Sequence, residues 1–208
     1  DPTPGSGQKI YQFLDSLGYI GDYSTMLADS LGTYLAVFVC VGVYPNNYII
    51  GDTSPEAESL VNFVNSGGRM YLEGDDVWYY DPMMSGYNFG PLFGIRGYGG
   101  LPQGNLFGIP GTFTQGMDFG YGGVEPSDLI APTGTGFLLF KSSFEDSVAV
   151  ANDPGIYRTV GIDFRIGSLI DSTPPSTRMI LLDSIMQFFL RGQEIRETNS
   201  SIEIQPLV

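Results

Sequence analysis

A nearly unbroken apolar run over residues 34–43 limits the fold more than any other segment of the chain. β-Branched and aromatic residues fill most of it, and residues 45–47, Pro-Asn-Asn, end it. Such a run is typical of a strand that is covered on both faces, as in a parallel sheet. It is too short to span a bilayer, which takes about 18 apolar residues or more. The sequence therefore predicts an α/β core built around this strand.

A helix and a second strand follow this run. Ser54 is the expected N-cap and Pro55 the first helical residue, and the helix is expected to end at residues 67–68, Gly-Gly. Residues 69–73 are predicted to form the next strand, which leads into a Gly74-Asp75-Asp76 turn. A strand, a helix and a strand with short glycine-containing joints favour a βαβ unit and a parallel sheet.

The rest of the chain divides by composition. A first helix is expected from an N-cap at Ser6, and a last helix over residues 178–190. Residues 81–135, rich in glycine and aromatics, are predicted to be an insertion of short strands and loops. We expect one domain over residues 1–192, with residues 193–208 as a tail or linker that pairs as an edge strand through residues 201–204.

Composition excludes several functions. The chain has 23 acidic and 9 basic residues and a net charge of -14, which disfavours nucleic acid and anionic membranes as partners. It contains no histidine, so histidine-dependent catalysis is excluded. The single cysteine, Cys40, lies inside the apolar run and is expected to be buried and inert.

Residues 64–76, 159–164 and 178–189 resemble the class I glutamine amidotransferase-like family, in the form found in exported bacterial multidomain proteins. The resemblance implies a three-layer α/β sandwich with a mainly parallel, flavodoxin-like sheet. It also implies an extracellular or cell-surface location, with neighbouring domains of the same protein as partners. A first strand is expected before residue 1, and without it a homodimer would cover the open sheet edge. Active members of the family carry a cysteine at the turn where Asp75 stands, backed by a histidine. A non-catalytic relative is therefore expected.

Acidic residues gather beyond the strand at residues 69–73. Asp75, Asp76 and Asp81 are the candidate metal ligands, because calcium prefers carboxylate oxygens. Their spacing matches no EF-hand loop, and aspartates also cap helices and stabilise turns. Both interpretations stay open at this point.

Aromatic residues follow these acids directly. Trp78, Tyr79 and Tyr80, together with Asp75 and Asp76, are the candidate ligand-binding residues, because aromatic rings beside carboxylates suit a carbohydrate or a protein segment. The alternative is that these rings pack a small core for the insertion.

Two functions remain. The first is a non-catalytic binding or structural module of an exported or cell-surface protein. The alternative is a glycoside hydrolase-like enzyme that uses paired carboxylates and needs no histidine, with Glu73, Asp75, Asp76 and Glu125 as candidates. Two carboxyl groups facing one cleft would favour the enzyme, and carboxylates bound only to backbone N–H groups would favour the module.

Overall fold

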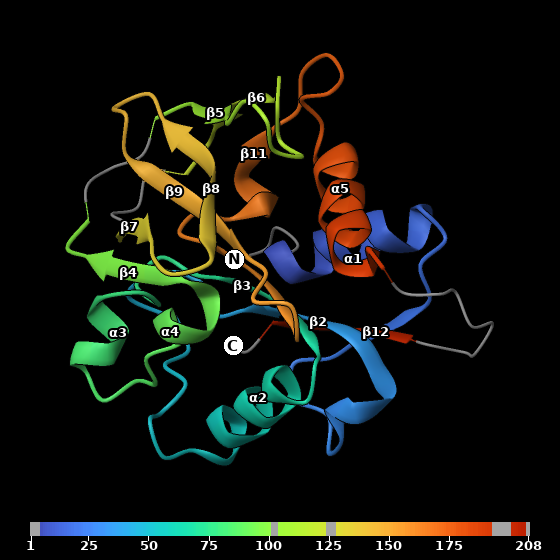
Figure 1. Ribbon diagram of the computed structural model, residues 1–208, viewed down its shortest axis with the longest axis vertical. Coiled ribbons are helices and arrows are strands. Elements are labelled where there is room, and N and C mark those ends of the chain that lie inside the picture. Colours follow the sequence, from blue (N-terminus) through green and yellow to red (C-terminus); the bar gives the residue numbers. More distant parts are fainter. Residues whose placement is uncertain (1–4, 101–103, 124–127, 193–200, 207–208) are drawn as a thin grey trace.

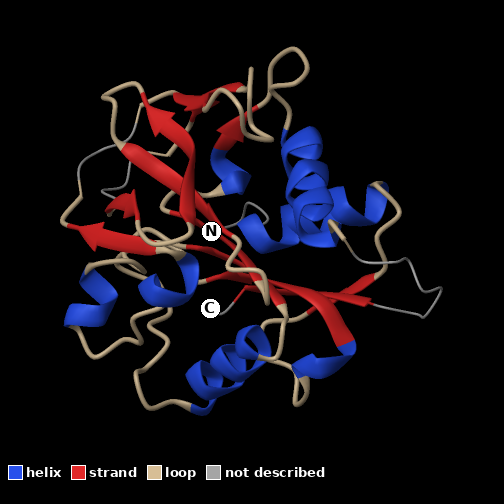
Figure 2. Ribbon diagram, in the orientation of Figure 1, coloured by secondary structure: helices blue, strands red, loops and turns tan. Residues whose placement is uncertain are grey.

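The computed structural model describes residues 5–100, 104–123 and 128–192 and the backbone of residues 201–206. Its centre is a ten-stranded mixed sheet (Figures 1 and 2). In pairing order the strands are β1 (Gly21–Tyr23), β12 (Ser201–Pro206), β2 (Tyr34–Cys40), β3 (Arg69–Glu73), β10 (Arg158–Ile162), β9 (Ser147–Asn152), β8 (Gly136–Ser142), β5 (Leu106–Gly108), β6 (Asp118–Tyr121) and β11 (Leu169–Ile170).

The sheet has a parallel half and an antiparallel half. The strands from β1 to β10 in this order pair in parallel. From β10 to β11 every pairing is antiparallel, and the sheet curls along its length (Figure 1). The predicted three-layer sandwich with a mainly parallel, flavodoxin-like sheet is therefore wrong. Only residues 143–146 join β8 to β9, and residues 153–157 join β9 to β10, whereas a parallel pair needs a crossover of a dozen residues or more.

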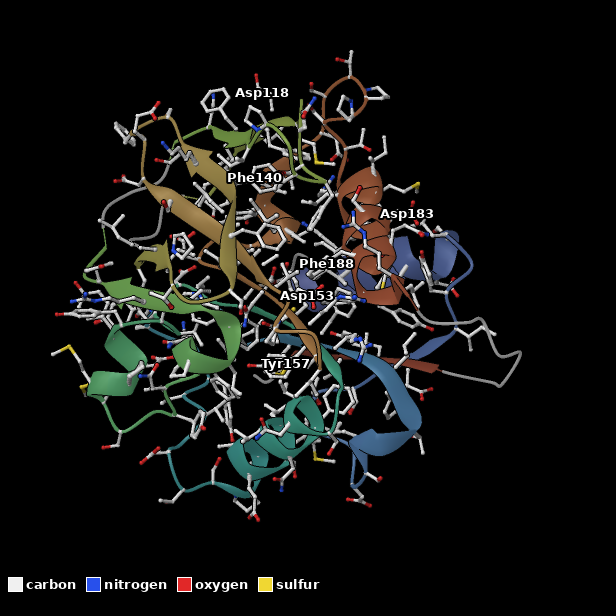
Figure 3. The ribbon with its side chains drawn as sticks, in the orientation of Figure 1. Asp118, Phe140, Asp153, Tyr157, Asp183 and Phe188 are labelled. Carbon is white, nitrogen blue, oxygen red and sulfur yellow. The ribbon has the colours of Figure 1, made fainter. Side chains whose placement is uncertain are left out.

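Helices cover both faces of the sheet (Figure 2). Helices α1 (Ser6–Ser16) and α5 (Arg178–Leu190) lie on one face, where Phe140 and Phe188 point into the core (Figure 3). The other face carries α2 (Pro55–Asn65) and the short helices α3 (Tyr80–Met83) and α4 (Gly90–Phe93). Two 3-10 turns, η1 (Leu31–Thr33) and η2 (Ile166–Ser168), complete the helical elements of the described residues.

Strand β2 explains the apolar run in the sequence. Phe38 packs into the core under α1 and α5, and its neighbours Val37 and Val39 pack into the core over α2. Successive side chains of a strand point to opposite faces, so a strand buried on both sides must be apolar at every position. The predicted strand with two covered faces is confirmed.

Local capping explains where two of the helices begin. The predicted cap of α2 is confirmed, because Ser54 Oγ accepts a hydrogen bond from Ala57 N–H at 3.1 Å and Pro55 is the first helical residue. The predicted N-cap at Ser6 is wrong. Gly5 holds that position, and Ser6 Oγ instead accepts from Gly167 N–H at 2.8 Å, a partner distant in the sequence.

Residues 81–135 contribute to the main sheet rather than only decorating its edge. They supply β5 and β6, and they also form β4 (Ile95–Tyr98) and β7 (Leu129–Pro132), which pair as a separate two-stranded sheet. Strand β12 contains the predicted edge strand, but it pairs with β1 on one side and β2 on the other, so the prediction of an edge position is wrong. The domain boundaries and a homodimer through the edge stay predictions. No helix among the described residues is long and apolar enough to cross a membrane.

Candidate ligand-binding site

A shallow pocket of about 530 Å³ lies on the surface formed by α3, α4 and β4, which Figure 1 shows next to one another. None of the side chains that line it is acidic, and one is cationic. The lining residues are Trp78, Tyr79, Pro82, Met83, Asn88, Pro91, Ile95, Arg96, Gly97 and Thr133.

Trp78 forms the fixed wall of this pocket. Its indole is buried, packs edge to face on Phe93 with ring centroids 5.2 Å apart, and donates from Nε1 to the carbonyl of Ile162 at 2.9 Å. Strand β4 lies directly against its backbone, because a Cβ at Gly97 would fall 2.1 Å from the carbonyl oxygen of Trp78. A larger residue at Gly97 would push β4 away and open the pocket.

Asp128 holds the turn that carries Trp78 and Tyr79. One oxygen of its buried carboxylate, Oδ2, accepts hydrogen bonds from the backbone N–H groups of both residues at 2.7 Å. The backbone N–H of Asp128 donates to the carbonyl of Asp75 at 2.9 Å. Asp128 is thus a positioning residue for the pocket wall. The sequence analysis missed it, because a lone aspartate distant in the sequence gives no local signal.

The predicted metal ligands Asp75, Asp76 and Asp81 are all buried. Burial and, to a lesser extent, the charge of Asp76 raise the pKa of Asp81 to about 6, while a hydrogen bond from Asn47 at 2.8 Å opposes the rise. Burial also raises the pKa of Asp76. Within the described part of the chain, no three carboxylate or thiol side chains are placed to share a metal ion, so a calcium site stays a prediction.

The charges of Asp76 and Asp81 affect the pKa of Asp128. Burial, with a smaller contribution from the negative charges of Asp76 and Asp81, raises its pKa to about 7. The hydrogen bonds from the N–H groups of Trp78 and Tyr79 oppose the rise, because they stabilise the ionised carboxylate. The three acids are buried carboxyl groups that affect one another's pKa, and none of them lines the pocket.

Glu73 lies in the opposite core and is also buried. Its Oε2 accepts from Tyr71 Oη at 2.6 Å and from the backbone N–H of Ile166 at 3.0 Å, and burial raises its pKa. Cys40 is buried as predicted, and desolvation raises the pKa of its thiol well above the ordinary value. Both groups lie in the packed core. Glu125, the fourth candidate acid, lies outside the described residues.

The candidate aromatic residues divide between the core and the surface. Tyr79 lines the pocket, and Tyr80, 42% exposed, packs edge to face against it with centroids 5.1 Å apart. Tyr98, a ring outside this set, is exposed on β4, with the guanidinium of Arg96 5.1 Å from its ring centroid. Trp78, by contrast, is buried in the core. Each of the two interpretations of the aromatic set therefore describes some of its members.

No protein-family model and no curated protein matches the sequence. Solved structures match the fold. A cold-adapted β-galactosidase from Rahnella sp. R3 matches with a TM-score of 0.58 and 12% identity, over 94% of this chain and 28% of that one. A β-galactosidase from Bacillus circulans sp. alkalophilus matches with a TM-score of 0.56 and 14% identity, over 88% and 26%. One from the haloarchaeon Halorubrum lacusprofundi matches with a TM-score of 0.52 and 12% identity, over 77% and 23%.

At these identities the likeness shows the fold alone, and the chain spans about a quarter of the length of each β-galactosidase. The fold of this chain therefore occurs within glycoside hydrolases. This finding and the mixed sheet overturn the predicted class I glutamine amidotransferase-like family. The segments that suggested it are helix, turn and strand patterns, which many α/β folds share.

Proposed function

We propose that this chain is a carbohydrate-binding domain of a glycoside hydrolase-like multidomain protein. Of the two functions expected from the sequence, the comparisons support the glycoside hydrolase-like class better than a module of unstated kind. The observation that carries the proposal is the pocket beside Trp78, which has aromatic and polar lining residues and no acidic one. The exported or cell-surface location and the neighbouring domains are part of this proposal.

The lining of the pocket offers both kinds of contact that a sugar needs. Sugar C–H faces pack on aromatic rings, and Tyr79 presents one beside the apolar Pro82 and Pro91. Asn88 Oδ1 accepts from Gly90 N–H at 3.0 Å, which fixes the side chain and leaves its Nδ2 to donate to a hydroxyl. The hydroxyl of Thr133 adds a further donor and acceptor. The volume of about 530 Å³ lies in the range of small-ligand sites.

Removal of the Tyr79 ring is expected to weaken saccharide binding by up to about tenfold, because one stacked ring contributes about 0.5–1.5 kcal/mol. Trp78 is the single tryptophan and lines the pocket, so its fluorescence reports on the site directly. We would titrate galacto-oligosaccharides into the wild-type protein and the Tyr79→Ala variant. The control is Tyr44→Ala, which removes an exposed ring that does not line the pocket.

Tyr44→Ala is expected to bind as the wild type does. If neither neutral nor acidic saccharides change the fluorescence or release heat in calorimetry, the proposed function is wrong. Equal weakening in both variants would also contradict it, because the loss would then not depend on the pocket.

The second candidate function is a glycoside hydrolase that uses paired carboxylates. The raised pKa values of Asp81 and Asp128, about 6 and about 7, favour it, since a general acid in such an enzyme has a raised pKa. Their burial, and the two backbone N–H groups bound to Asp128, favour a structural role.

We expect no hydrolysis of aryl β-galactosides above the uncatalysed rate, because both acids are buried and neither lines the pocket. The measurement is release of the aryl group by the wild type and by Asp81→Asn, with the melting temperature of each recorded. Turnover that Asp81→Asn reduces more than about a hundredfold without loss of folding would establish the hydrolase instead.

A further inference from the structure

The pocket has a single charged lining residue, Arg96 on β4. We propose that the pocket selects a saccharide that carries a carboxylate, a uronic acid, and that the Arg96 guanidinium pairs with this carboxylate. The inference rests on the proposed function, because it names the class of sugar that the same pocket takes.

Strand β4 fixes where Arg96 points. Ile95 is buried, whereas Arg96 and Tyr98 are exposed, so the two side chains share the outer face of the strand. Arg96 pairs with Ala131 and Tyr98 with Leu129 of β7. The guanidinium therefore extends from a paired strand, which holds a binding group more precisely than a loop would.

Tyr98 supports the guanidinium from one side. The Cζ atom of Arg96 lies 5.1 Å from the centroid of the Tyr98 ring, a cation–π distance. A guanidinium that stacks on a ring through its flat face keeps its N–H groups, which lie in the plane, available to donate. The edge of a guanidinium matches a carboxylate through two parallel hydrogen bonds.

Arg96 differs from Arg158 and Arg178 in its partners. Arg158 pairs with Asp153 at 2.8 Å, and Arg178 pairs with Asp171 at 3.0 Å. Within the described residues, Arg96 has the ring of Tyr98 as its partner and no carboxylate. A guanidinium beside a pocket that has no carboxylate partner among the described residues is suited to receive the charge of a ligand.

The rest of the lining favours a sugar acid over other anions. Tyr79, Pro82 and Met83 offer an apolar surface to a ring, and this surface gives no binding energy to a bare phosphate. A uronic acid combines one carboxylate with a ring and several hydroxyls.

The test compares trigalacturonate with neutral galactotriose by calorimetry on the full chain. Trigalacturonate is expected to bind about tenfold more tightly, and Arg96→Ala should remove this preference by weakening the binding of trigalacturonate far more than that of galactotriose. Arg96→Lys should retain only part of it, because an ammonium cannot form the paired hydrogen bonds. Lys141→Ala is the matched control, since it removes the same charge from an exposed residue that does not line the pocket.

Equal affinity for both saccharides, unchanged in Arg96→Ala, would overturn the inference and leave the proposed function standing. Binding of neither saccharide would overturn both. Inorganic phosphate binding more tightly than trigalacturonate would also overturn the inference. Equal loss in Arg96→Ala and Lys141→Ala would overturn it as well, because the preference would then come from net charge alone.

Discussion

Replacement of Trp78 by alanine is expected to lower the free energy of unfolding by about 3–5 kcal/mol. The indole is buried, packs on Phe93 and donates to the carbonyl of Ile162, so its loss leaves a large cavity and an unpaired carbonyl. Urea denaturation followed by circular dichroism measures the change, since the variant has no tryptophan left to fluoresce. The same variant should lose saccharide binding, because Trp78 forms the pocket wall.

Two further variants show whether the loss arises at the indole. Trp78→Phe keeps an aromatic ring and removes the N–H donor, and is expected to cost about 1–2 kcal/mol less than Trp78→Ala. Tyr80→Ala removes an exposed neighbouring ring and should cost about 1 kcal/mol or less. A loss below about 1 kcal/mol in Trp78→Ala would mean that this turn is not part of the packed core.

The stability of the chain is expected to rise as the pH falls from about 7.5 to about 5. Asp128 and Asp81 have pKa values of about 7 and about 6 in the folded chain, against an ordinary value of 3.8. At pH values between 3.8 and the pKa of each group in the folded chain, the folded state binds more protons than the unfolded state. The contribution of these two groups is therefore fully present below pH 3.8 and is lost as the pH rises through 6 and 7. A rise to about 7 corresponds to about 4 kcal/mol as an upper limit for Asp128.

Asp128→Asn isolates this effect. The amide oxygen still accepts from the N–H groups of Trp78 and Tyr79, but the side chain cannot ionise. Its melting temperature should change less between pH 5 and pH 7.5 than that of the wild type. The control is Asp118→Asn, which removes the same charge from an exposed residue (Figure 3). This control is needed because the net charge of -14 also favours folding at lower pH. Equal pH profiles in all three proteins would contradict the assignment to Asp128.

Local features of the fold were predictable, and strand pairing was not. Ser54 and Pro55 begin α2 as predicted, and the apolar run forms β2, because these features depend on neighbouring residues. The antiparallel half depends on how short strands such as β5 and β6 find partners distant in the sequence. Periodicity does not specify such partners.

The candidate site was predicted in part. Trp78 and Tyr79 were named and line the pocket, but Asp75, Asp76 and Asp81 are buried beside it rather than open to a ligand. The alternation of side chains between the two faces of a strand can be recognised in the sequence. The sequence Ile95-Arg96-Gly97-Tyr98 places Arg96 and Tyr98 on one face, and that pattern would have identified the cation.

Methyl NMR of the methionines tests carbohydrate binding at the pocket most directly. The chain has seven methionines, of which Met83 lines the pocket and is 67% exposed. Met26 and Met179 are exposed and do not line it. During titration with galacto-oligosaccharides and trigalacturonate, the Met83 methyl resonance is expected to shift and saturate while those of Met26 and Met179 stay unchanged. No shift at Met83 with any of these saccharides, or shifts only at Met26 or Met179, would contradict the proposal.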